Sequence, residues 1–319
     1  MDSTTNAYAT QEFIKFAVKD RLSASYLLNM PGNIPFWLTT KGCANPSILS
    51  KKETLSAVTP ICFSGPTKGD ASRIVNTIIE HNPAVAAGFI QTRIEGNGDE
   101  TADAILHRSH EEQAAIYEDF RTNYRIPLHL GVDELKSRMK RDSRSRVNKL
   151  KGCMDTFTID TDKSKQNIQS FTDLYKHTAS KNSFSHAYCF EYEDWDTLLQ
   201  NPLWYLVTLH KDNVMVGGAV LASVPDGFDY AFMAYDDASP DLSRLLILVS
   251  YEFASSLHDD EGYFYLGGGI SEEDALARFK ISMGGEAIKF KRIKFAQTRD
   301  LLPSISQHEL KAQMSMRWP

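Results

Sequence analysis

One lysine occupies a position where a helix is expected to bury an apolar side chain. Leu276, Phe279, Lys280 and Met283 follow one another at i, i+3, i+4 and i+7, the spacing of the buried face of an amphipathic helix. The aliphatic stem of Lys280 can pass the edge of a core and leave its ammonium group in water. The alternative is an ammonium group that points into a cleft, where a fixed positive charge stabilises a developing oxyanion.

Three consecutive glycines, Gly267, Gly268 and Gly269, precede this helix. A phosphate-binding loop needs Lys and then Ser or Thr directly after its last glycine, whereas Ile270, Ser271 and three acidic residues follow here. The glycines are therefore not a phosphate loop. They predict either a tight strand-to-helix turn or a strand end whose backbone amides are open to a substrate.

The helix after the glycines is expected at 272–283. Ser271 is its predicted N-cap, with Asp274 as the reciprocal partner three residues later. Gly284 and Gly285 follow the last apolar position, which predicts a helix end closed by glycine in a left-handed conformation.

A basic segment lies near the middle of a chain whose net charge is −6. Eight of the sixteen residues from 136 to 151 are Lys or Arg, and an apolar stripe runs through them at helical spacing. Two interpretations stay open, a solvated linker helix and a phosphate-binding helix, because arginine forks match phosphate oxygens. The stripe consists of Leu135, Met139, Val147 and Leu150, and the basic residues beside it are Arg141, Arg144, Arg146 and Lys151.

Strand and helix patterns alternate along the whole chain, and two turn sequences, KDN and PDG, indicate hairpins in the second half. The predicted strands are 37–39, 55–63, 85–92, 128–131, 203–210, 214–224, 228–235 and 263–266. The predicted helices are 71–81, 110–123, 164–180, 242–257 and 272–283. Strands in a meander followed by strand–helix units predict an α/β fold with mixed sheets flanked by helices.

Two short echoes suggest a tandem duplication. DASR at 70–73 resembles DLSR at 241–244, and GFI from Gly88 resembles GYF from Gly262, at offsets of 171 and 174 residues. We predict an N-terminal domain at 1–132, a basic linker helix at 133–153 and a C-terminal domain at 154–319.

Metal and disulfide chemistry are not expected. His107, His110 and Glu111 fall within one turn at the start of a predicted helix, but no further ligand is evident, so we predict no metal. The cysteines show no CxxC spacing, which predicts buried free thiols in a reducing compartment. With a polar N-terminus and no apolar run longer than 245–249, we expect a cytoplasmic protein without a signal peptide or a membrane span.

The C-terminal stretch resembles a known family. LGGG, a short gap, DAL, RFK and MGG resemble the signature of the Fem-type (FemABX-like) transferases of the GNAT superfamily. The segment LHLGVDELKSRMKRDSRSRVNKLKG is similar to the connection between their two GNAT-like domains, and CFSGPTKG to a strand and loop of their first domain.

This resemblance implies tandem GNAT-like domains that transfer an acyl or aminoacyl group from acyl-CoA or aminoacyl-tRNA to an amine of a small-molecule, nucleotide-linked or cell-envelope acceptor. It places Phe279 and Lys280 near the transfer centre, and Arg144 or Arg146 on an acceptor phosphate. Two departures weaken the donor assignments. No helical hairpin is inserted for tRNA, and AYDDASPDLSR lacks the glycines of a CoA loop.

The implied reaction is attack by a neutral amine on an ester or thioester, with Lys280 and the amides of Gly267–Gly269 or of Gly217–Gly218 near the oxyanion. Tyr235 is expected to line the cleft. The candidates for the general base are Asp236, Asp237, Asp274 and His186. Two other functions stay open: a non-catalytic GNAT-like binding module, and an RNA-contacting protein that uses the helix at 136–151.

Overall fold

The computed structural model describes residues 7, 10, 12–13, 16, 23–30, 34–42, 55–59, 85–95, 105–108, 115–151, 157–184, 188–224, 226–237, 241–258, 262–268 and 274–296. The chain forms two compact units. One comprises Thr122–Ile288 with Met1–Ala7 and Pro319, and the other comprises Tyr8–Arg121 with Lys289–Trp318. The basic segment therefore belongs to the same compact unit as the second half of the chain, and the last part of the chain returns to the unit built from the first half.

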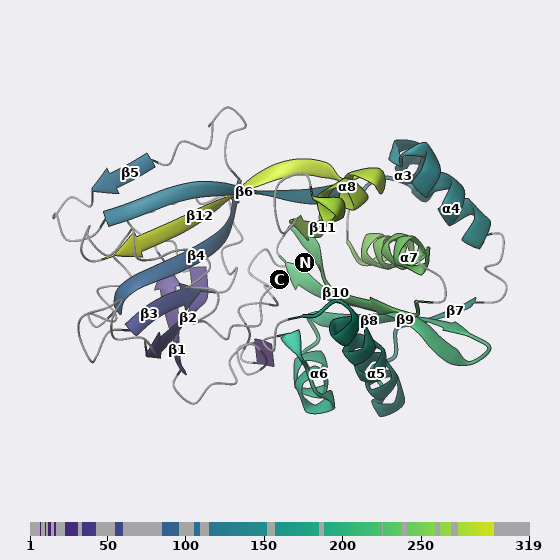
Figure 1. Cartoon of the computed structure of the whole chain (residues 1–319), viewed down its shortest axis with the longest axis horizontal. Coiled ribbons are helices and arrows are strands. Elements are labelled where there is room, and N and C mark those ends of the chain that lie inside the picture. The colour runs from purple at the N-terminus through teal and green to yellow at the C-terminus, as the bar shows by residue number, and fades with distance from the viewer. Residues whose placement is uncertain are drawn as a thin grey trace. The chain divides into compact units, whose positions relative to one another are not determined.

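The Tyr8–Arg121 unit contains a mixed sheet in the order β1-β2-β3-β4-β12 (Figure 1). β1 and β2 form an antiparallel hairpin, β3 and β4 are parallel, and β12 pairs antiparallel with β4. Its strands are β1 (Ser23–Met30), β2 (Ile34–Gly42), β3 (Leu55–Thr59), β4 (Val85–Glu95), β5 (Ile105–Arg108) and, from Lys289 onwards, β12 (Glu286–Ala296). The strands predicted at 37–39 and 85–92 are confirmed, as is 55–63 over its described part. The helix predicted at 71–81 lies outside the described residues.

The prediction of a helix at 110–123 is wrong where the structure describes it. Ala115–Pro127 forms strand β6, which pairs antiparallel with β5 and, through its last residues, with strand β11 (Tyr263–Gly268). Backbone pairing on both sides outweighs the helical propensity of the segment, as tertiary context commonly does. The residues at 128–131, predicted as a strand, form the turn after β6.

Histidine 107 lies in a strand, so the helical turn that suggested a metal site is not formed there. His107 belongs to β5, while His110 and Glu111 lie outside the described residues. No cluster of three His, Cys, Asp or Glu residues suited to a metal occurs in the described part of the chain. Cys189 is a free thiol, but it is exposed rather than buried as predicted.

The Thr122–Ile288 unit contains a second mixed sheet in the order β6-β11-β10-β9-β8-β7. The predicted meander is confirmed as β8 (Trp204–Lys211), β9 (Val214–Val224) and β10 (Gly227–Tyr235). Asp212 and Asn213 turn the first hairpin with φ values of +51° and +63°, as a type I′ turn requires. β7 (Phe157–Asp160) completes the sheet beside β8.

Helices cover both faces of this second sheet (Figure 1). On one face lie α5 (Lys165–Lys181) and α6 (Tyr192–Leu199), and on the other lies α7 (Leu242–Leu257). The predictions at 164–180 and 242–257 are confirmed. Among the described residues, no helix has both the length and the apolar character needed to cross a membrane.

The basic segment forms two helices rather than the single helix predicted at 133–153. α3 (Val132–Arg138) and α4 (Arg141–Lys151) are separated at Met139, whose backbone is extended at φ −64° and ψ 144°. The break still leaves the predicted apolar stripe on the core, because Leu135, Met139 and Val147 are all buried.

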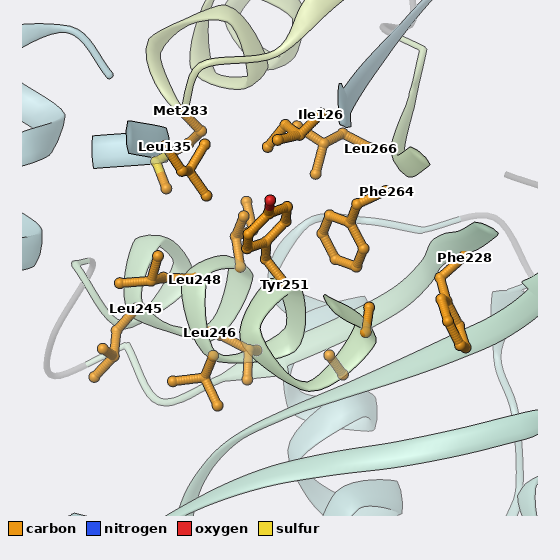
Figure 2. Packing of buried hydrophobic residues seen from close by; sticks show 14 of the residues in the cluster. Ile126, Leu135, Phe228, Leu245, Leu246, Leu248, Tyr251, Phe264, Leu266 and Met283 are labelled. Carbon is orange, nitrogen blue, oxygen red and sulfur yellow. The ribbon is translucent and has the colours of Figure 1, made fainter. Parts of the chain in front are cut away.

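The main core lies between α7 and the sheet (Figure 2). Leu245, Leu246, Leu248 and Tyr251 of α7 face apolar side chains of the strands and of α3. The sheet contributes Ile126, Phe228, Phe264 and Leu266. α7 is buried on all sides over Leu245–Tyr251, as expected for a helix whose apolar residues surround its axis.

Candidate functional site

The parallel pairing between β10 and β11 ends partway along both strands. Its registered pairs are Gly227 with Tyr263, Phe228 with Phe264, and Asp229 with Tyr265. β10 then continues to Tyr235 and β11 to Gly268, and these described residues form no further β10–β11 pair. In open α/β sheets, ligands bind beyond the carboxyl ends of strands where neighbours part. These two strand ends therefore form the candidate site.

Lys280 reaches the end of β11. Its Nζ donates to the Gly268 carbonyl oxygen at 2.6 Å, and the residue is only 8% exposed. Gly267 has a φ of +72°, and a Cβ added there would lie 3.5 Å from this Nζ. The structure therefore brings Lys280 together with Gly267 and Gly268 and buries the ammonium group instead of leaving it in water. Gly269 lies outside the described residues.

The helix that carries Lys280 is shorter than predicted. α8 spans Ala275–Ser282, and its N-cap is Asp274, whose Oδ1 accepts a hydrogen bond from the Ala277 N–H at 2.7 Å. Asp274 is thus the cap itself rather than the partner of a cap at Ser271, which lies outside the described residues. A carboxylate at this position satisfies an orphan amide of the first turn.

Of the two glycines predicted to close α8 in a left-handed conformation, Gly284 does so and Gly285 does not. Gly284 has a φ of +89°, and its N–H bonds to the Ile281 carbonyl at 3.1 Å. The Gly285 N–H bonds to the Lys280 carbonyl at 3.1 Å. These two bonds form a Schellman motif, so the end of the helix lies within one turn of the lysine.

The buried face of α8 differs from the predicted stripe at one position. Ala277, Lys280 and Met283 are buried, whereas Leu276 is 37% exposed. Successive helical residues are separated by about 100° around the axis, so burying Ala277 turns Leu276 towards solvent.

Phe279 lies beneath an arginine that the sequence did not single out as a site residue. The Arg244 guanidinium carbon lies 5.2 Å from the centroid of the Phe279 ring. Arg244 belongs to the first turn of α7, where the DLSR sequence was noted only as an echo of DASR. The sequence signal that could have indicated Arg244 is an arginine three residues after an aspartate at a predicted helix start.

The two arginines predicted to bind phosphate have different surroundings. Arg146 donates to Asp142 at 3.0 Å and to Asp241 at 3.1 Å, and hydrogen bonds to Asp241 and then Asp142 raise the pKa of its guanidinium. Within the described residues, the Arg144 side chain makes one long hydrogen bond, to the Ser137 carbonyl at 3.5 Å. The Arg144 side chain thus makes fewer hydrogen bonds within the protein than the Arg146 side chain.

Tyr235 is the last residue of β10, and Asp236 follows it directly. The Asp236 N–H bonds to the Val216 carbonyl at 2.8 Å, and its side chain is exposed. The next residue, Asp237, is held by Lys181 at 2.6 Å and His177 at 3.1 Å, and hydrogen bonding from Lys181 is the largest cause of its lowered pKa. A carboxylate so stabilised is a poor base near neutral pH. His186 lies outside the described residues.

Gly217 and Gly218, the alternative oxyanion donors, lie inside β9. They pair with β8 on one side and with β10 on the other, and a Cβ on Gly218 would come within 2.6 Å of the Phe171 ring. The absence of a side chain there makes room for α5. Of the two glycine pairs, Gly267 and Gly268 are therefore the better placed beside Lys280.

No protein-family model matches this sequence, and a search of curated proteins gives no match. Solved structures do share its fold. They include FemX, with a TM-score of 0.60, 12% identity and coverage of 89% of this chain and 90% of that chain. The C-terminal domain assigned to a lysylphosphatidylglycerol synthetase of Agrobacterium fabrum has a TM-score of 0.58, 10% identity and coverage of 100% and 99%.

L-PGS of Bacillus licheniformis has a TM-score of 0.57, 8% identity and coverage of 92% of this chain and 89% of that chain. At such identities the similarity establishes the fold alone. This chain shares the fold of FemX, an α/β fold with mixed sheets flanked by helices, as the sequence resemblance predicted.

Proposed function

We propose that this protein is an acyltransferase that moves an acyl or aminoacyl group from acyl-CoA or aminoacyl-tRNA to an amine of a small-molecule, nucleotide-linked or cell-envelope acceptor. One observation carries the proposal: the ammonium group of Lys280 is buried against Gly268 where β10 and β11 cease to pair. The shared fold of FemX and of the Agrobacterium fabrum domain supports it.

The chemistry needs no covalent enzyme intermediate. The neutral amine of the acceptor attacks the carbonyl carbon of the donor, and the carbonyl oxygen becomes an oxyanion. The attack forms the C–N bond. Collapse then re-forms the carbonyl and breaks the bond to the thiol or hydroxyl leaving group, which can take the proton lost by the amine. The Lys280 ammonium donates to Gly268 at this strand end, and a buried positive charge stabilises an oxyanion strongly.

The basic helix α4 supplies the second part of the proposal. Arg144 and Arg146 would bind a phosphate of the acceptor or donor. For Arg146 this requires exchange with Asp142 or Asp241, its present partners. A general RNA contact along α4 is less favoured, because these carboxylates already neutralise Arg146 and the chain carries a net charge of −6.

A Lys280→Met variant tests the proposal, because methionine keeps a long side chain in the same space without the charge. Pooled acyl-CoA and aminoacyl-tRNA donors would be incubated with amine acceptors, and the products identified by mass spectrometry. We expect transfer to fall about 10²- to 10³-fold, as for loss of an oxyanion donor.

The matched control is Lys176→Met, which removes an exposed lysine paired with Glu191 on α5 and should leave transfer unchanged. Circular dichroism would confirm that both variants fold. Equal turnover of wild type and Lys280→Met would show that Lys280 takes no part in the transfer reaction. Binding of a donor by the wild-type protein without any turnover would favour the non-catalytic binding module instead.

A further inference from the structure

Arg244 contacts two other helices from the first turn of α7. Its Nε donates to the Ser143 hydroxyl of α4 at 3.3 Å, and its guanidinium carbon lies 5.2 Å from the Phe279 ring of α8. Its Nη1 lies 3.5 Å from Asp241, which anchors the group within α7. The Arg244 side chain is 18% exposed, so these contacts are largely shielded from water.

A chain of hydroxyl groups leads from Arg244 back to Phe279. Because Ser143 accepts from the arginine, its own hydrogen is available for the Ser282 hydroxyl, 2.8 Å away. Ser282 in turn donates to the Phe279 carbonyl oxygen at 2.7 Å. Successive hydrogen bonds in such a chain polarise one another, which strengthens each bond. Arg244 therefore reaches Phe279 twice, directly at its ring and through two serines at its carbonyl.

Helix α8 depends on such contacts for its position. It has eight residues, and an isolated helix of this length is not stable in water. Leu276 and Ile281 are exposed, so its apolar anchors are few. A displacement of about 1 Å is enough to disturb a catalytic arrangement, and Lys280 directly follows Phe279.

We infer that Arg244 is a positioning residue that holds Phe279, and with it Lys280, against the end of β11. The catalytic meaning of this inference rests on the proposed function. The positional effect does not, because the accessibility of the Lys280 amine can be measured without any transfer reaction.

Trace acetylation with acetic anhydride, read for each lysine by mass spectrometry, reports how often the Lys280 amine becomes accessible. Arg244→Leu should raise the labelling rate of Lys280 about tenfold, the factor expected from losing a largely desolvated cation–π contact. Arg244→Lys keeps the cation but not the planar fork, so its Lys280 rate should fall between those of wild type and Arg244→Leu.

Lys163 provides an internal control. It is partly buried on the α5 and α6 side of the sheet, where its Nζ donates to the carbonyls of Leu199, Asn201 and Trp204. Its labelling rate should stay within about twofold of wild type in every variant, since local changes far apart are independent. An equal rise at Lys163 and Lys280 would mean general loosening and would overturn the inference.

Two further variants keep the test decisive if Arg244→Leu does not fold. Phe279→Leu removes the ring, and Ser143→Ala interrupts the hydroxyl chain, so each should raise Lys280 labelling. Unchanged Lys280 labelling in both variants would refute the positioning role.

Once a transfer assay exists, Arg244→Leu should lower kcat with little change in KM. If Lys280→Met leaves transfer unchanged while Arg244→Leu still exposes Lys280, the proposed function fails and the positioning role stands.

Discussion

Two adjacent hydroxyl groups on α7 should differ sharply in their contribution to stability. Tyr251 and Ser250 are both fully buried. The Tyr251 hydroxyl lies 2.8 Å from the Pro127 carbonyl oxygen and 2.7 Å from that of Leu130, whereas the Ser250 hydroxyl has no hydrogen-bond partner within the described part of the chain. Tyr251→Phe and Ser250→Ala each remove one buried oxygen, but only the first leaves buried acceptors unpaired.

The expected magnitudes follow from these surroundings. Tyr251→Phe should lower the free energy of unfolding by about 1–3 kcal/mol, because the single hydroxyl hydrogen that the Pro127 and Leu130 carbonyl oxygens share is lost at the turn after β6. Ser250→Ala leaves no partner behind and replaces serine with a better helix former, which should raise that free energy by about 0.5 kcal/mol. The two variants thus move stability in opposite directions.

Urea unfolding followed by circular dichroism measures both changes, and m-values equal to that of wild type would show that the folded and unfolded states remain comparable. Burial raises the pKa of Tyr251 to about 12. The folded pKa exceeds the unfolded pKa of about 10. The stability that the neutral Tyr251 hydroxyl contributes is therefore fully present below pH 10 and is lost as the pH rises to 12. Tyr251→Phe should therefore lose less stability than wild type over that interval. Equal destabilisation by the two variants would refute the reasoning.

Three further expectations concern helix ends and one aspartate. Asp274→Ala should cost about 1 kcal/mol in urea unfolding, whereas Asp274→Asn, which retains a capping oxygen, should cost a few tenths. Gly284→Ala places a side chain at a φ of +89° and should cost about 1–2 kcal/mol. Gly131→Ala, at a φ of −64° with no atom within 4 Å of the added Cβ, should cost less in the same assay, because it loses only the N-cap preference for glycine. Hydrogen bonding from the Asp162 N–H is the largest cause of the lowered pKa of Asp160, so its stabilising effect is present above about pH 4 and lost as the pH falls through the lower folded pKa. Asp160→Asn should consequently flatten the acid limb of stability against pH, and an unchanged limb would contradict this assignment.

Elements with a strong local pattern were predicted well. α5 carries an apolar period, α7 carries a continuous apolar run, and the β8–β9–β10 meander has turn residues between apolar runs. Each occurs close to its predicted bounds. The end of α8 at Gly284 was also correct, because glycine directly after an apolar position has a specific conformational reason.

Elements that depend on distant partners were predicted poorly. β6 was taken for a helix, since its sequence has no clean alternation and its strand character comes from pairing with β5 and β11. The break at Met139 between α3 and α4 was missed for a similar reason: no Pro or Gly marks it, and the apolar stripe reads as continuous through it.

At the candidate site, the sequence by itself determined that one lysine stands on the apolar face of a helix behind a glycine-rich strand end, because helical period and glycine chemistry are local properties. It also indicated the family whose fold the structure shares. Only the tertiary structure decided which groups surround Lys280 and its neighbour Phe279. Its carbonyl partner at Gly268, the arginine above Phe279 and the serines that join α4 to α8 come from segments as much as 139 positions apart. Such contacts form only when long-range packing brings those segments together, and no local spacing encodes them.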